Sequence, residues 1–61
     1  MIEFTDMDGC VWAINSQYVV AIQRKYDTLL IYFEHEDNFF EIEMISVEAA
    51  IAVMEQYKSL Y

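Results

Sequence analysis

The chain has 61 residues, with eleven acidic and three basic side chains and a net charge of −8. This charge argues against direct binding of nucleic acid or an anionic membrane surface, because both repel acidic proteins. Hydrophobic residues make up 57% of the chain, far above the content of disordered proteins, so we expect one folded domain over residues 1–61.

A domain of this size buries little apolar surface, while ordering it costs roughly 1.5 kcal/mol per residue. Small domains usually compensate with disulfides, a metal or a partner subunit. The single cysteine, Cys10, cannot form an internal disulfide and fits a reducing compartment. No signal peptide and no apolar run of about 18 residues is apparent, so we expect a cytoplasmic protein without membrane insertion.

The first predicted element is a hairpin. Residues 2–6 alternate apolar with polar side chains, and Asp8-Gly9 favours a type I′ turn because it tolerates positive φ. Residues 10–14 form the return strand, with Cys10, Trp12 and Ile14 on one face. We therefore expect Cys10 to be a small core residue.

A third strand is predicted over residues 18–23, after the polar break Asn15-Ser16-Gln17. Strict alternation would place Tyr18, Val20 and Ile22 on one face and the residues between them on the other.

The fourth and fifth strands, residues 28–34 and 39–44, are predicted to flank a connection that runs from Glu34 to Asn38. The fourth strand is apolar on both faces for most of its length, so something must cover its second face as well. The fifth strand has a one-sided pattern, with an apolar face and a mainly acidic face that begins with an aromatic residue. The apolar face consists of Phe40, Ile42 and Met44, and the other face consists of Phe39, Glu41 and Glu43.

A helix is predicted from Val47 to about Ser59, with Ser46 as its N-cap. Its apolar stripe consists of Val47, Ala50, Ile51, Met54 and Tyr57. The fold class is therefore α+β: an antiparallel β-meander of about five strands with one C-terminal helix packed on one face.

Several apolar residues are expected on the sheet face opposite the helix, and they form a patch too large to leave in water. We expect a second copy to cover it, most simply in a two-fold homodimer. A different protein docked on the patch is the alternative. The patch contains Val11, Ala13, Val19, Ala21, Leu30, Tyr32 and Phe39.

No arrangement of residues predicts catalysis, a metal site or a cofactor. His35 lies among acids, but no second histidine completes a metal site, and neighbouring strand residues point to opposite sides. Asp6-Met7-Asp8-Gly9 resembles the start of a calcium loop, yet Trp12 and Ile14 stand where oxygen ligands are needed. Cys10 and His35 as nucleophile and base would need a supported pocket that 61 residues scarcely provide.

The acidic hairpin formed by the fourth and fifth strands is the predicted partner-binding site. Glu41 and Glu43 lie about 6.5–7 Å apart on one face, close to the phosphate repeat of a nucleic-acid strand, so they could imitate phosphates as small phage-encoded inhibitors do. An ordinary solvated face that keeps the protein soluble is the simpler alternative. The residues of the predicted site are Glu34, Glu36, Asp37, Glu41 and Glu43.

The order of features also resembles the FlbD/SwrD family of small flagellar and swarming-motility proteins. The matching features are Met1-Ile2, Asp8-Gly9, Asn15, Ile22, Asp27-Thr28 and Ser46-Val47-Glu48. The resemblance implies a non-enzymatic accessory protein of the flagellar motor. Two departures are Asp37-Asn38, where the family usually has a glycine, and acids in place of most basic residues.

Together these features predict a non-enzymatic protein that regulates or inhibits another protein by meeting its basic surface. A motility accessory role and a passive structural subunit are the alternatives.

Overall fold

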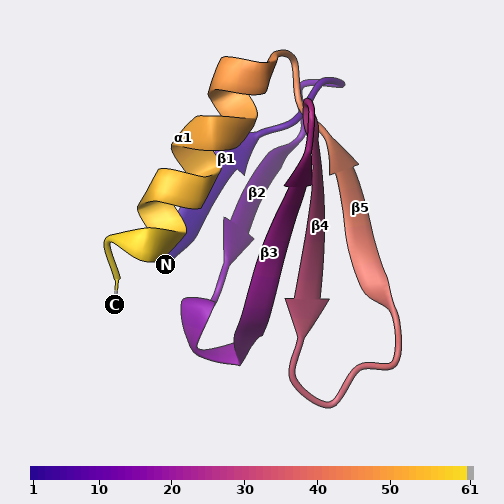
Figure 1. The fold of residues 1–61 in the computed structure, drawn as a ribbon, viewed down its shortest axis with the longest axis vertical. Coiled ribbons are helices and arrows are strands. Elements are labelled where there is room, and N and C mark those ends of the chain that lie inside the picture. The colour runs from indigo at the N-terminus through magenta and orange to yellow at the C-terminus, as the bar shows by residue number, and fades with distance from the viewer. Residues whose placement is uncertain (61) are drawn as a thin grey trace.

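The computed structural model describes residues 1–60 and contains five antiparallel strands followed by one C-terminal helix, as predicted (Figure 1). No helix within these residues is long and apolar enough to cross a bilayer. The elements are β1 (Ile2–Thr5), β2 (Val11–Ile14), the 3₁₀ helix η1 (Ser16–Tyr18), β3 (Val19–Lys25), β4 (Thr28–Phe33), β5 (Phe39–Glu43) and α1 (Val47–Lys58).

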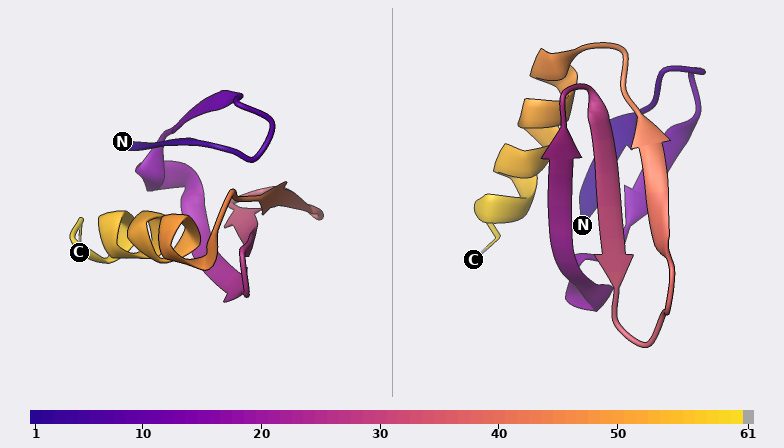
Figure 2. Two further views of the ribbon diagram at one scale, coloured as in Figure 1. Left: turned by 90° about the horizontal axis from the view of Figure 1, so that it is seen from above. Right: turned by 45° about the vertical axis from the view of Figure 1, so that its right-hand side comes forward.

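The strands form two sheets, a hairpin of β1 and β2 and a three-stranded sheet in the order β3-β4-β5. In the right-hand view of Figure 2, the three-stranded sheet lies in front and the hairpin behind it. The polar break between them becomes η1, whose N-cap Asn15 accepts a hydrogen bond from the Gln17 N–H at 3.0 Å. This turn carries the chain from one sheet to the other, a division that the sequence did not predict.

Helix α1 packs against β1, β3 and β4, so hairpin, sheet and helix enclose one core (Figure 2). Ser46 caps the helix by accepting a hydrogen bond from the Ala49 N–H at 3.1 Å. Ala50 and Val53 are buried, whereas Ile51 of the predicted apolar stripe is 40% exposed. The core consists of Ile2, Ile14, Val19, Ile22, Leu29, Ile31, Ile42, Met44, Ala50 and Val53.

Strand β3 does not alternate as predicted, because a β-bulge interrupts its pairing with β4. Val19 pairs with Phe33 and Ala21 with Tyr32, so Val20 is an extra residue on the β3 side. The extra residue turns both Val19 and Ile22 into the core and leaves Val20 63% exposed.

The first hairpin turn lies where predicted but has a different geometry. A type I′ turn needs two consecutive residues with positive φ, whereas Gly9 alone in this turn has one, at +84°. Strand β2 begins at Val11, so Cys10 belongs to the turn and is exposed as a free thiol. The expectation of a buried Cys10 is therefore wrong.

Candidate protein-binding surface

The candidate site is the outer face of the three-stranded sheet, which neither α1 nor the β1–β2 hairpin covers (Figure 2). The pairing of Ala21 with Tyr32 and of Tyr32 with Phe39 shows which side chains share this face. Its members, here called the outer face, are Ala21, Gln23, Lys25, Thr28, Leu30, Tyr32, Phe39, Glu41 and Glu43.

An aromatic pair lies at one end of the outer face. The rings of Tyr32 and Phe39, opposite each other on β4 and β5, have centroids 5.2 Å apart. The Tyr32 hydroxyl donates a hydrogen bond to Gln23 Oε1 of β3 at 3.2 Å, and this bond orients the Tyr32 ring. Together with the contact to Phe39, the group spans all three strands. Phe39 remains 45% exposed, while Leu30 beside it is half-buried. An aromatic group held in place and open to solvent is typical of a protein contact surface.

The acidic residues of the predicted site are all exposed in the structure. Glu41 pairs with Leu30 and Glu43 with Thr28, so both carboxylates stand on the outer face next to the apolar residues. The other three acids, Glu34, Glu36 and Asp37, lie in the loop between β4 and β5.

His35 occupies the tip of this loop with φ +68° and lies 3.5 Å from Glu34 Oε1 through its Nε2. The side chain of His35 is 85% exposed, so this ion pair is weak and forms only when the histidine is protonated. The loop is therefore a solvated acidic tip.

The structure divides the predicted self-association patch. Val19 is 7% exposed and belongs to the core, because the β3 bulge turns it inward, so its place in the patch is wrong. Val11 and Ala13 are exposed on β2, in the other sheet, and do not join the outer face. Ala21, Leu30, Tyr32 and Phe39 remain together.

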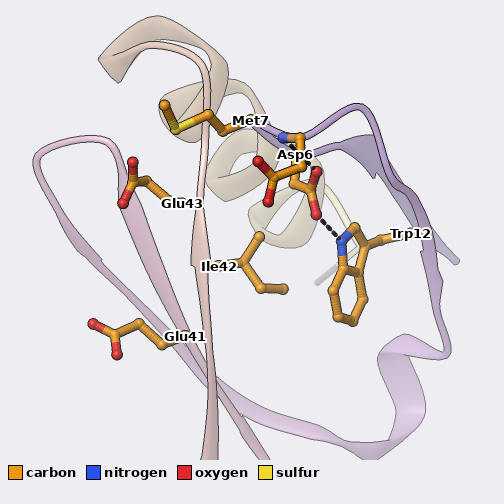
Figure 3. Close-up of a pocket in the computed structure, with 7 residues that line it drawn as sticks. Asp6, Met7, Trp12, Glu41, Ile42 and Glu43 are labelled. Atoms are coloured by element: carbon orange, nitrogen blue, oxygen red, sulfur yellow. Dashed lines mark hydrogen bonds between the residues drawn. The ribbon is translucent and has the colours of Figure 1, made fainter.

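A groove that the sequence did not reveal runs beside β5, between this strand and the β1–β2 turn. It has a volume of about 320 Å³ and is open to solvent. Figure 3 shows Ile42 pointing toward Trp12 on one side of β5, while Glu41 and Glu43 point to the other. Its lining residues are Asp6, Met7, Asp8, Trp12, Glu41, Ile42 and Glu43.

Asp6 shapes the wall of this groove. Its Oδ2 accepts a hydrogen bond from Trp12 Nε1 at 2.9 Å, and its Oδ1 accepts from the backbone N–H groups of Asp8 and Cys10, both at 2.9 Å. These donors, the Trp12 indole foremost, favour the ionised carboxylate and lower the pKa of Asp6 below its ordinary value of 3.8.

The described residues 1–60 contain no group of three or more histidine, cysteine, aspartate or glutamate side chains placed to hold a metal ion. The β1–β2 turn, which contains Cys10, and the β4–β5 tip, which contains His35, lie at opposite ends of the molecule (Figure 1). The structure therefore does not bring this pair together as nucleophile and base.

Comparisons with protein-family models, with curated proteins and with solved structures find no match. The resemblance to the FlbD/SwrD family stays an expectation from the sequence.

Proposed function

We propose that this protein binds another protein through the outer face and the adjoining acidic loop, and regulates or inhibits it without catalysis. The observation that carries the proposal is the uncovered outer face, on which the exposed Phe39 ring stands beside the carboxylates of Glu41 and Glu43. A face built only for solubility would have no need of an oriented aromatic pair.

The two kinds of side chain have different parts in such a contact. Burial of Phe39 and of the open parts of Leu30 and Tyr32 would contribute affinity, since apolar area removed from water stabilises a complex by roughly 25 cal/mol per Å² before the costs of association. The acids would select a basic partner and speed the encounter. Among the residues of the outer face, Lys25 is the one basic side chain and Glu41 and Glu43 are acidic. The electrostatic potential of the outer face is therefore negative.

The finer proposal is that the partner's basic surface is a nucleic-acid-binding site and that the acids imitate phosphates. Two features support it: Glu41 and Glu43 stand two residues apart on one face, and the whole chain has a net charge of −8. An inhibitor of the kind that phages encode fits this description.

Self-association is a second proposal, supported by the four apolar residues that remain on the outer face. A two-fold dimer would cover Leu30, Tyr32 and Phe39 and leave the acidic loop free for a partner. Light scattering over a range of concentrations tests it, because a monomer at all concentrations contradicts the dimer. Neither the motility role nor the passive structural role has a feature of the structure in its favour.

Affinity capture from an extract of the native cell tests the binding proposal. Three baits are compared: the wild type, Glu41→Lys/Glu43→Lys and Glu48→Lys/Glu55→Lys. The two variants change the net charge equally, but the second pair lies exposed on α1, away from the outer face. We expect the wild type and the Glu48→Lys/Glu55→Lys variant to capture the same partner protein. The Glu41→Lys/Glu43→Lys variant should fail to capture it.

Equal retention by all three baits would contradict the proposal. Circular dichroism of each bait shows that it is folded, so loss of binding is not confused with unfolding. The change at Glu48 replaces an acid with a base in the first turn of α1, which costs on the order of 1 kcal/mol. The change at Glu55 removes an exposed ion pair with Lys58, which contributes little.

A further inference from the structure

Strand β5 is the edge of its sheet, and part of its backbone has no neighbour. The Met44 N–H donates to the Asp27 carbonyl at 2.8 Å, which makes residues 40, 42 and 44 the ones whose backbone groups point toward β4. The N–H and C=O groups of Phe39, Glu41 and Glu43 therefore point outward.

One of these outward groups is already used, and it shows that the edge accepts a strand-like contact. The Met7 N–H in the β1–β2 turn donates to the Glu43 carbonyl at 2.9 Å. Among the residues that the structure describes, no such contact reaches Glu41 or Phe39. The open length of the edge thus ends at Glu43 and runs toward the acidic loop.

Side chains of α1 bond to backbone groups on the two edges next to the helix, at Glu3 of β1 and at Val19 of β3. The Gln56 amide bonds both backbone groups of Glu3 at 2.9 Å, as a neighbouring strand would, and so covers β1. The Tyr57 hydroxyl donates to the Val19 carbonyl of β3 at 3.4 Å. Covering of strand edges by a neighbouring helix is one way in which proteins avoid unwanted pairing. The outer edge of β2 also has unpaired backbone groups, at Val11 and Ala13. The side chains of these two residues are uncharged, so they would not select a charged partner.

The groove beside β5 has a different chemistry on each side of the open edge (Figure 3). On the core side stand Trp12 and Phe40, with ring centroids 6.1 Å apart and Phe40 50% exposed. On the outer side stand the carboxylates of Glu41 and Glu43. A strand laid along this edge would turn alternate side chains to these two sides.

We propose that the β5 edge takes up an extended segment of the partner as a fourth strand, and that this segment alternates lysine or arginine with apolar residues. Its backbone pairs with Glu41 and Phe39, its basic side chains meet Glu41 and Glu43, and its apolar side chains meet Trp12 and Phe40. Main-chain bonds supply affinity in this mode of recognition, and the alternate side chains supply specificity. The inference rests on the proposed function and names the form of the partner.

A second copy of the chain fits this edge poorly. In the antiparallel register that pairs the whole of β5 with itself, Glu41 would stand opposite Glu41 of the second copy. Like charges directly opposite each other destabilise a pair of strands. The charge pattern therefore favours a basic segment over self-pairing.

The test uses a short peptide with blocked termini in which lysine and valine alternate, and a control peptide in which glutamate replaces lysine. Both are titrated into the ¹⁵N-labelled protein. We expect the lysine peptide to shift the amide signals of Phe39 and Glu41, to give intermolecular contacts between peptide Hα and the Glu41 N–H, and to slow exchange of that N–H by about tenfold or more. The glutamate peptide should do none of this.

Two variants separate the backbone contact from the charge. Glu41→Gln removes the carboxylate and keeps the N–H, whereas Glu41→Pro removes both, and proline is tolerated here because this N–H does not bond to β4. We expect Glu41→Gln to weaken binding of the lysine peptide and Glu41→Pro to abolish it.

Equal binding by the two variants, or unchanged exchange of the Glu41 N–H in the wild type with peptide bound, would overturn strand addition and leave the proposed function standing. If Glu41→Gln and Glu41→Pro both bound the lysine peptide with wild-type affinity, and the Glu41→Lys/Glu43→Lys bait captured the partner unchanged, strand addition and the proposed function would both be overturned. Slowed exchange of this N–H in the free protein at high concentration would assign the edge to a second copy and overturn the inference as well. The exchange measurement uses the wild type alone, so the test survives if Glu41→Pro does not fold.

Discussion

Trp12 Nε1 donates a hydrogen bond of 2.9 Å to Asp6 Oδ2, and this bond joins the two ends of the first hairpin turn. The other oxygen of Asp6 accepts from two backbone N–H groups of the turn, so one carboxylate organises both the turn and the indole. The ring of Trp12 in turn stacks on Phe4, with centroids 6.2 Å apart, and reaches Phe40 of the other sheet. Asp6 thus links the geometry of the turn to the contact between the sheets.

Asp6→Asn should destabilise the protein, because an amide has one acceptor oxygen where the carboxylate offers two. Because the pKa of Asp6 is lowered in the folded protein, the stability that this carboxylate contributes depends on pH. The stability that the carboxylate supplies is complete well above the ordinary value of 3.8 and is lost as pH falls through the lower pKa of the folded state.

Urea unfolding of both proteins, followed by Trp12 fluorescence, measures this dependence. We expect a constant difference in unfolding free energy above about pH 5 that shrinks at lower pH. Asp8→Asn, with the same change of charge in the same turn, is the control. A difference between wild type and Asp6→Asn that stayed constant down to acid unfolding would contradict the assignment.

Leu29→Ala should cost about 2–5 kcal/mol in unfolding free energy, because Leu29 is fully buried between the sheets and the helix. Leu30 is the next residue along β4 and lies half-buried on the outer face. Leu30→Ala removes the same atoms as Leu29→Ala but should lower the unfolding free energy much less. Denaturant unfolding compares the two variants. Equal losses would mean that the outer face is covered, as in a dimer.

Ser46→Ala should destabilise the protein by about 1 kcal/mol, since it removes the oxygen that accepts the Ala49 N–H at the start of α1. Ser46→Asp keeps an acceptor there and is expected to retain most of the stability. Thermal unfolding followed by circular dichroism distinguishes the two. A loss of the same size in both variants would show that the cap is not the cause.

Gln56→Ala should open the β1 edge, because the Gln56 amide bonds the Glu3 N–H and the Glu3 carbonyl. We expect faster hydrogen exchange of the Glu3 amide, by about tenfold, with little change at Leu29. Gln56→Glu keeps an acceptor for the Glu3 N–H and should restore part of the protection. An unchanged exchange rate in Gln56→Ala would mean that the amide pair does not protect this edge.

Much of the fold could be predicted because hydrophobic alternation and turn residues report directly on strands. The alternation failed at β3, where the bulge at Val20 adds one residue and reverses which side chains are buried. A bulge depends on how β3 meets β4, and local sequence does not reveal it. For the same reason the sequence does not reveal the division into two sheets, since η1 redirects the chain through contacts that only the folded molecule contains.

The candidate site was predicted in part. The exposed acids follow from charge, and the outer-face position of Glu41 and Glu43 follows from the period of a strand. The groove beside β5 joins Trp12 to Ile42, which are thirty positions apart, and no local pattern connects them. Which edge is open also depends on side chains far away in sequence, such as Gln56 on Glu3.

The most direct test of the binding proposal is the salt dependence of affinity, measured by calorimetry with the purified protein that the wild-type bait retains. An acidic surface that meets a basic one should lose about tenfold or more in affinity when monovalent salt rises from roughly 0.05 to 0.5 M, and Glu41→Lys/Glu43→Lys should bind weakly at every salt concentration. An affinity that does not change with salt, and that the variant retains, would contradict the role assigned to these acids.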